Sequence, residues 1–263
     1  MSHVFDHLTI RVSDFAESRR FYDEALGLPT HDGDFTEWGD FGIVAADRPD
    51  LVTRRLHVGF GVEGRDAVDA WWLRMTGAGY QSDGEPGPRP EYTESYYGGF
   101  ILDPDGNSVE AVHHHRVRTR RADDDWLHSG DVPDGSRVPQ IDHVWLRTRD
   151  VPSIKAFYET IASSVGIELV GDNPDGVRFS DGEGSFTFVT GDEPTHNAHF
   201  AFGVPDFDSV KRFHEAATAA GYHDNGAPGE RPQYHPGYFA AYVFDPDGHN
   251  VEAVFHDRSH ADG

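Results

Sequence analysis

Residues 98–112 read Gly-Gly-Phe-Ile-Leu-Asp-Pro-Asp-Gly-Asn-Ser-Val-Glu-Ala-Val, and residues 240–254 read Ala-Ala-Tyr-Val-Phe-Asp-Pro-Asp-Gly-His-Asn-Val-Glu-Ala-Val. Asp-Pro-Asp-Gly is a turn sequence, because proline presets φ at the second position and glycine accepts the conformation needed at the fourth. Each copy is therefore predicted to be a β-hairpin. Alternation along the returning strand places Glu110 and Glu252 on the face opposite their valine and alanine neighbours. The two carboxylates thus point away from the side of the sheet that packs.

These hairpins belong to a longer repeat. Most matching positions in the two halves are 142 residues apart, as in the pairs His57 with His199 and Glu110 with Glu252. On the opening strand of each half the spacing is 136 residues, as in the pair His7 with His143. The repeat predicts a first domain at residues 1–115, a linker at 116–138 and a second domain at 139–258. The histidine tract 113–115 is interpreted as a solvated chance run and not as a metal site.

Each half contains two copies of one plan, a strand and a helix followed by further strands. Period-two alternation predicts leading strands at 6–12, 56–62, 141–146 and 198–202. Apolar residues at helical spacing predict helices at 15–26, 66–76, 152–162 and 209–220. The sequence therefore predicts an α+β fold built from four βαβββ modules.

Composition excludes several classes of function. The chain has 46 acidic and 22 basic residues, and its net charge of −24 would repel the phosphate backbone of a nucleic acid. Cysteine is absent, which excludes disulfides, thiol nucleophiles and cysteine-ligated metal. No secretory signal follows Met1, and no apolar run approaches the roughly 18 residues that span a bilayer. We expect a cytoplasmic protein without nucleic-acid or membrane partners.

Ligand-type residues recur on the polar strand faces. Each half places a histidine on the leading strand of both modules and a glutamate on the last strand: His7, His57 and Glu110 in the first half, and His143, His199 and Glu252 in the second. Two imidazoles and one carboxylate form a facial divalent-metal site with open coordination positions. The two triads at matching positions favour metal binding over isolated, hydrogen-bonded histidines.

With these motifs the chain resembles the vicinal oxygen chelate superfamily, which includes glyoxalase I, type I extradiol dioxygenases, fosfomycin-modifying thiol transferases and bleomycin-binding proteins. The resemblance covers nearly the whole chain outside the linker. It implies paired βαβββ modules that form cupped, barrel-like sheets around a divalent metal, which chelates vicinal oxygens of a small-molecule substrate. Fe(II) is favoured as the metal, with Mn, Zn or Ni as alternatives, and the expected state is a monomer or homodimer.

The second half is similar to the extradiol dioxygenase signature, in which a histidine and a tyrosine precede the ligating glutamate. His235 and Tyr242 occupy these places, and the resemblance implies catalytic roles for both, although Gln233 and Ala241 depart from the signature. The strands near 42–46 and 185–190 lack the carboxylate that would supply the fourth ligand of glyoxalase I. We therefore expect an extradiol-dioxygenase-like oxygenase.

Three alternatives remain open at this point. They are a glyoxalase-like lyase or isomerase, a fosfomycin-type thiol transferase, and a non-catalytic binding protein of the bleomycin type. The transferases also have an opening strand that reads His-Leu-Thr, as residues 7–9 do here, but we interpret Thr9 as an ordinary strand residue.

The repeat is compatible with two ways of assembling the triads. Each half could close on itself, or the halves could exchange modules, so that His7 joins His199 and Glu252 while His143 joins His57 and Glu110. Extradiol enzymes with a similar tandem layout use the first arrangement, so we expect self-closed halves.

Overall fold

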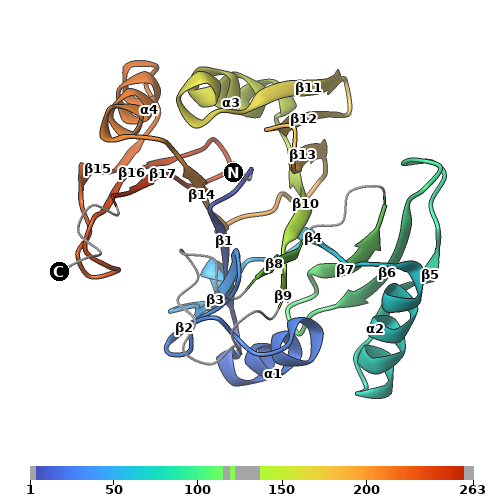
Figure 1. The fold of residues 1–263 in the computed structure, drawn as a ribbon. Coiled ribbons are helices and arrows are strands. Elements are labelled where there is room, and N and C mark those ends of the chain that lie inside the picture. The colour runs from blue at the N-terminus through green and yellow to red at the C-terminus, as the bar shows by residue number, and fades with distance from the viewer. Residues whose placement is uncertain (1–3, 115–118, 122–136, 258–263) are drawn as a thin grey trace. The chain divides into compact units, whose positions relative to one another are not determined.

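The computed structural model describes residues 4–114, 119–121 and 137–257 (Figure 1). Most of the predicted linker, together with His115, lies outside the described residues. The helices are α1 (Phe15–Leu26), α2 (Arg65–Gly77), α3 (Val151–Val165) and α4 (Phe207–Ala219), with a short 3-10 helix η1 at Pro49–Leu51. None of the helices in the described ranges is long and apolar enough to cross a membrane.

Two open mixed sheets contain most of the strands. The seven-stranded sheet has the order β15 (Asp224–Glu230), β16 (Tyr238–Phe244), β17 (Asn250–His256), β14 (His199–Gly203), β1 (His7–Val12), β3 (Phe41–Ala45) and β2 (Phe35–Trp38). The eight-stranded sheet has the order β11 (Glu168–Asn173), β12 (Gly176–Ser180), β13 (Ser185–Thr190), β10 (Ile141–Thr148), β4 (His57–Gly61), β7 (Ser108–His113), β6 (Tyr97–Leu102) and β5 (Ser82–Pro88). A third, two-stranded sheet pairs β8 (Thr119–Arg121) with β9 (Arg137–Pro139).

This architecture confirms the predicted α+β class. Three modules have the full βαβββ plan, and they begin at β4, β10 and β14. The first module has only β2 and β3 after its helix, with an isolated bridge between His31 and Glu37 in place of a further strand. Each large sheet has two edge strands, so neither closes into a barrel.

The chain divides into two compact units. One unit comprises residues 9–145, and the other comprises residues 1–8 with 146–263. The start of each opening strand therefore belongs with the other half of the sequence: His7 and Leu8 group with the second half, and 141–145 with the first.

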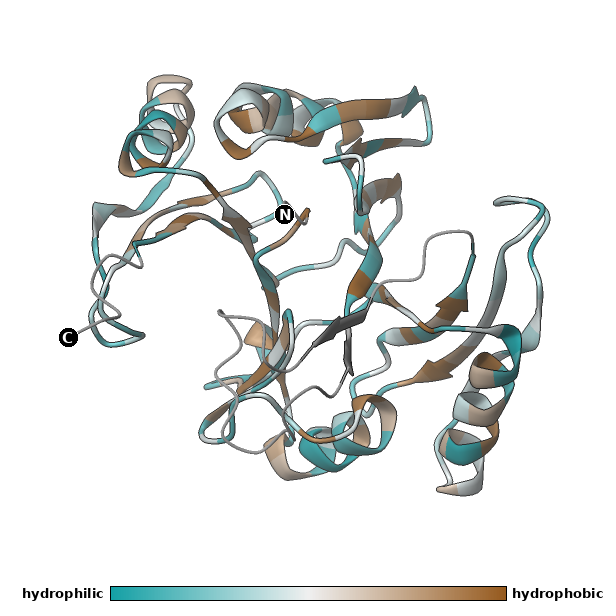
Figure 2. Ribbon diagram, viewed as in Figure 1, coloured by the Kyte–Doolittle hydropathy of each residue, from teal (hydrophilic) through white to brown (hydrophobic). Residues whose placement is uncertain are grey.

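Capping residues set the helix boundaries. Asp14 accepts a hydrogen bond from the Glu17 N–H at the start of α1, and Asp150 accepts one from the Ser153 N–H at the start of α3. Gly166 ends α3 at a φ of 75°, in the left-handed region that favours glycine. Figure 2 shows apolar and polar residues alternating along the helices. The apolar residues Phe21 and Tyr22 of α1 and Phe157 and Tyr158 of α3 are buried.

Both Asp-Pro-Asp-Gly turns form the predicted hairpins, β6 with β7 and β16 with β17. Asp103 Oδ1 accepts the N–H groups of Asp105 and Asn107, and Asp245 Oδ1 accepts those of Asp247 and His249. A buried tyrosine hydroxyl donates to the other oxygen of each aspartate, Tyr22 at 2.9 Å to Asp103 and Tyr158 at 3.2 Å to Asp245. The turns are thus fixed to the first helix of each half.

One difference between the turns affects ionisation. The side-chain amide of Asn107 donates a hydrogen bond to Asp103. The equivalent residue in the second turn is His249, and within the described residues its side chain makes no hydrogen bond to Asp245. Burial raises the pKa of Asp245 to about 7 despite the hydrogen bonds from His249 N–H and Tyr158. Burial lowers the pKa of His249 to about 4.

These two shifts predict opposing pH effects on stability. Between about pH 4 and 7 the unfolded chain releases the Asp245 proton that the folded chain keeps, so this group makes folding less favourable as pH rises. The unfolded chain protonates His249 below about pH 6.5 while the folded chain keeps it neutral, so this group makes folding more favourable as pH rises. The two contributions have opposite signs in the wild type.

Asp245→Asn should remove only the first contribution. The urea midpoint of the variant should then rise between pH 4.5 and 6.5, with a slope in unfolding free energy on the order of 1 kcal/mol per pH unit. The wild type and the exposed-site control Asp83→Asn should share a profile with a smaller slope, because Asp245 still opposes His249 in both. A flat profile for Asp245→Asn would contradict the assigned ionisation.

Candidate metal centres

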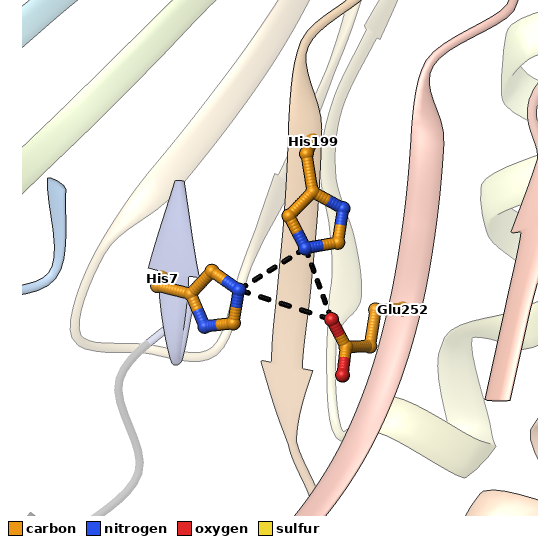
Figure 3. Close-up of side chains that lie close together, drawn as sticks. All are labelled: His7, His199 and Glu252. Carbon is orange, nitrogen blue, oxygen red and sulfur yellow. Dashed lines mark hydrogen bonds and ion pairs between the residues drawn. The ribbon is translucent and has the colours of Figure 1, made fainter. Parts of the chain in front are cut away.

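The first candidate centre lies in the unit formed by residues 1–8 and 146–263, and comprises His7, His199 and Glu252 (Figure 3). His7 Nε2 lies 3.1 Å from His199 Nε2, and His199 Nε2 lies 3.0 Å from Glu252 Oε2. The distance from His7 Nε2 to the same carboxylate oxygen is 3.8 Å. Figure 3 shows the three side chains converging from β1, β14 and β17.

Strand register explains this convergence. β14 and β17 are parallel neighbours in which Ala201 pairs with Glu252, and His199 lies two residues before Ala201 on the same face. The N–H of Asp6, just before β1, donates to the carbonyl of Ala201 at 2.7 Å. The three ligand-type side chains therefore share one face of adjacent strands.

The second candidate centre repeats this arrangement in residues 9–145, with His57, Glu110 and His143. His57 Nε2 lies 3.1 Å from both His143 Nε2 and Glu110 Oε2. The distance from His143 Nε2 to Glu110 Oε2 is 3.2 Å. The parallel pair β4 and β7 places Gly59 opposite Glu110, and β10 places His143 opposite Gly59. Glu110 is 0% exposed and Glu252 is 1% exposed, so both carboxylates are removed from bulk water.

The expectation of self-closed halves is wrong. The structure brings His7 to His199 and Glu252, and His143 to His57 and Glu110, which is the exchanged arrangement. Packing supplies the reason, since Phe5 beside His7 lies against Phe186, Phe200 and Phe202 with ring centroids 5.4 to 5.5 Å apart. These three phenylalanines all belong to the second half, so the apolar cluster holds the N-terminal strand there.

Glycine makes room for the second centre. A Cβ atom at Gly59 would lie 2.3 Å from His143 Cε1, and one at Gly98 would lie 2.0 Å from Glu110 Oε1.

Gly59→Ala should therefore displace the His143 ring and reduce bound metal from two ions to one per chain, measured by elemental analysis after dialysis. The repeat-equivalent change Ala201→Gly adds no atom and should retain two ions. If the Gly59→Ala variant still held two ions after dialysis, the position of the His143 ring would not be needed for metal binding at the second centre.

A tyrosine holds each carboxylate, which the sequence analysis missed. The Tyr96 hydroxyl donates to Glu110 at 2.9 Å, and the Tyr238 hydroxyl donates to Glu252 Oε1 at 2.7 Å. Both tyrosines are buried and precede their glutamate by 14 residues. The recurrence of this spacing in both halves was a signal that could have identified them.

An aspartate and a further histidine also form a hydrogen-bonded chain behind each opening-strand histidine. In the first centre His7 Nδ1 donates to Asp6 at 3.0 Å, and His256 Nε2 donates to the same carboxylate at 3.1 Å. In the second centre His143 Nδ1 donates to Asp142 at 2.9 Å, and His114 Nε2 donates to it at 2.7 Å. His114 is half-buried in this network, and the half-buried His113 has its Nδ1 3.1 Å from the Val62 carbonyl, so the interpretation of the tract as a solvated run is wrong for both described residues.

These contacts fix the tautomers of His7 and His143. A histidine that donates from Nδ1 presents the lone pair of Nε2, the atom that faces the triad. His199 Nδ1 lies 3.1 Å from the Asn250 carbonyl, an acceptor, and 2.8 Å from the Asn250 side-chain amide, a donor, so its contacts do not select one tautomer. Nε2 lone pairs about 3 Å apart repel one another unless a proton or metal ion lies between them, so the donor set suits a cation.

The donor separations also fit a divalent metal. Adjacent ligands of an octahedral ion at about 2.1 Å are about 3.0 Å apart. All three separations in the second centre and two of three in the first are close to this value. The residues of both triads therefore fit three ligands on one face of a divalent ion.

Without metal, the ionic interactions inside the triads shift their pKa values. Burial raises the pKa of Glu110, but hydrogen bonds from His143 and His57 outweigh this and hold it below its usual value. Burial lowers the pKa of His143, while its bonds to Asp142 and Glu110 raise it to a net value of about 9. A metal ion entering this centre must therefore displace a proton.

The two proposed catalytic residues take different places. Tyr242 pairs with Glu252 across β16 and β17, on the same face, and its ring centroid lies 6.3 Å from that of His199. Burial and the charge of Glu252 raise the pKa of Tyr242. His235 instead contacts His256 Nδ1 at 2.8 Å through Nε2, and the Pro236 carbonyl at 2.8 Å through Nδ1. It thereby extends the chain of hydrogen bonds that leads through Asp6 to His7.

Comparison with known proteins identifies the family. Residues 4–111 and 140–253 match the Glyoxalase/Bleomycin resistance protein/Dioxygenase superfamily. The chain belongs to this superfamily. A comparison with curated proteins finds no match.

Solved structures of this superfamily share the fold. Glyoxalase I from Zea mays aligns with a TM-score of 0.64 and 20% identity, over 97% of this chain and 93% of that chain. A candidate dioxygenase from Bacillus subtilis aligns with a TM-score of 0.65 and 17% identity, over 97% of this chain and 86% of that chain. At these identities the similarity establishes the fold alone.

The strands β3 and β13 offer no carboxylate as a fourth ligand. Neither of them contains an aspartate or glutamate. Within the described residues, each candidate group has three ligand-type members. The donor set is therefore His, His and Glu in both centres.

Proposed function

We propose that this protein is a divalent-metal enzyme with two His-His-Glu centres that act on vicinal oxygens of a small substrate, and that its reaction is dioxygenase-like. The observation that carries the proposal is the paired triads, whose donor atoms lie about 3 Å apart on one face. Three protein ligands leave space for a bidentate substrate and for one further small molecule. This supports an oxygenase over a lyase that uses four protein ligands.

The metal would supply Lewis acidity toward the two substrate oxygens, and Fe(II) is the favoured ion because it also permits oxygen chemistry. The protein residues would orient the ligands and exclude water. Tyr238 holds Glu252 in place, and Asp6 fixes the His7 ring with Nε2 toward the triad. Tyr242 would donate a hydrogen bond to the bound substrate from its place beside His199.

We expect the centre with Tyr242 to be the more active one. Its counterpart in the other centre is Phe100, whose ring has no hydroxyl, and Thr93 replaces His235. Both ring nitrogens of His235 contact neighbouring groups, so we assign it a positioning role through His256 and not direct proton transfer.

Oxygen uptake tests the proposal. The Fe(II)-loaded protein should consume oxygen and form a yellow ring-fission product with at least one member of a catechol panel. Tyr242→Phe should lower this turnover by a factor of about 100 or more. Tyr222→Phe, which changes a tyrosine packed on Phe157, should leave it unchanged. Metal-loaded protein that consumes no oxygen but converts a hemithioacetal would establish the lyase alternative instead.

A further inference from the structure

An arginine lies at the far end of the row of side chains that begins at each triad glutamate. In the first centre Glu252 on β17 pairs with Tyr242 on β16, and Tyr242 pairs with Gly226 on β15. The Arg231 guanidinium lies over the Tyr242 ring, with its Cζ 5.3 Å from the ring centroid. The row therefore leads from a metal ligand across an aromatic ring to a positive charge.

The position of Arg231 is built into the loop before β16. Its Nη2 donates to the Ala227 carbonyl at 2.8 Å, and its Nη1 donates to the Glu230 carbonyl at 3.1 Å. A Cβ atom at Gly229 would lie 2.9 Å from Nη1, and one at Gly226 would lie 2.8 Å from the Tyr242 ring. Two glycines thus leave space for the half-buried guanidinium and for the ring beneath it.

The other centre has the same construction. Glu110 pairs with Phe100, and Phe100 pairs with Gly84 on β5. Arg89 Cζ lies 5.3 Å from the Phe100 ring centroid, and Arg89 Nη2 donates to the Glu85 carbonyl at 2.8 Å. The aromatic residue changes between the two centres, whereas the arginine and its backbone bonds are kept.

In the part of the chain that the structure describes, the guanidinium groups of Arg89 and Arg231 have no carboxylate partner, although the protein is strongly acidic. The chain has 46 acidic residues and only 22 basic ones, yet among the described residues no carboxylate lies within 4.0 Å of either guanidinium. Backbone carbonyls orient the two groups but leave their charge unneutralised. A half-buried arginine held in this way is suited to bind a planar carboxylate through two parallel hydrogen bonds.

Strand spacing sets the length of the ligand. Neighbouring strands are about 4.8 Å apart, so the row from β17 to β15 spans about 10 Å, and Arg231 extends back over its middle position. We infer that the substrate is a carboxylate whose acidic group binds Arg231, or Arg89 in the other centre, while its vicinal oxygens face the triad. This inference rests on the proposed metal function and adds the substrate class.

Calorimetry on the full-length protein loaded with redox-inert Zn(II) tests the inference. The probes are catechol, 3,4-dihydroxybenzoate and 3,4-dihydroxyphenylacetate, which share the vicinal oxygens but differ in the acid. The wild type should bind at least one of the two acids about tenfold or more tightly than catechol. Arg89→Gln with Arg231→Gln should abolish this preference and leave the catechol affinity unchanged. Arg48→Gln with Arg212→Gln, which removes the same charge at exposed sites, should retain it.

Two failures can be told apart. If two Zn(II) ions and catechol bind but the acids show no advantage, or if their advantage survives in the Arg89 and Arg231 double variant, the arginine assignment is overturned and the metal centres stand. If Zn(II) does not bind, or if none of the three probes binds to the loaded protein, the proposed function fails and the substrate class fails with it.

Discussion

Replacing Glu110 and Glu252 together with glutamine is expected to reduce bound divalent metal from two ions per chain to none that survives dialysis, and to lower turnover by a factor of 1000 or more, roughly. Glutamine keeps the size of the side chain and can still accept a hydrogen bond from Tyr96 or Tyr238. It removes the negative charge that a divalent ion requires beside two neutral imidazoles. Far-ultraviolet circular dichroism should therefore change little while elemental analysis shows the loss.

The matched control changes two exposed glutamates, Glu168→Gln with Glu215→Gln, which alters the net charge by the same amount. This control should keep both ions and full turnover. Stoichiometric metal in the Glu110 and Glu252 double variant would mean that the ions bind elsewhere on this acidic surface.

Much of the fold could be predicted because local signals agree with one another. The two turns fix the hairpins, helical spacing of apolar residues fixes four helices, and the repeat reveals the modular plan. The ligand-type residues could be identified as well, because alternation places Glu110 and Glu252 on polar faces and the repeat singles out four histidines. All six occur in the two candidate groups.

The pairing of these residues could not be predicted, because both arrangements use the same local signals. Only long-range packing distinguishes them, such as the contacts of Phe5 with Phe186, Phe200 and Phe202. Gly59 leaves space beside His57 for the His143 ring, which comes from the other half of the sequence. Sequence separation of this kind leaves no trace in hydrophobic periodicity.

The residues that support the ligands were missed for a different reason. Asp6 and Asp142 each directly precede a ligand-type histidine, but alternation assigns neighbouring strand residues to opposite faces. Asp6 lies just before β1, where its side chain can bond His7 and His256. A repeated Asp-His pair at equivalent positions was the available signal.

Paired histidine substitutions separate the two arrangements with the largest contrast. In the exchanged arrangement His7 and His199 serve one ion, so His7→Ala with His199→Ala should empty one centre and leave the other intact. His7 and His57 serve different ions, so His7→Ala with His57→Ala should empty both. Self-closed halves require the reverse outcome, because His7 and His57 would then share an ion.

Counting the metal bound to these two double variants is the most direct test of the central claim that each centre draws its ligands from both halves. Elemental analysis of protein purified without chelator, loaded with one metal and dialysed, should give one ion per chain for His7→Ala with His199→Ala, and none for His7→Ala with His57→Ala. None for the first variant and one for the second would contradict the exchanged centres.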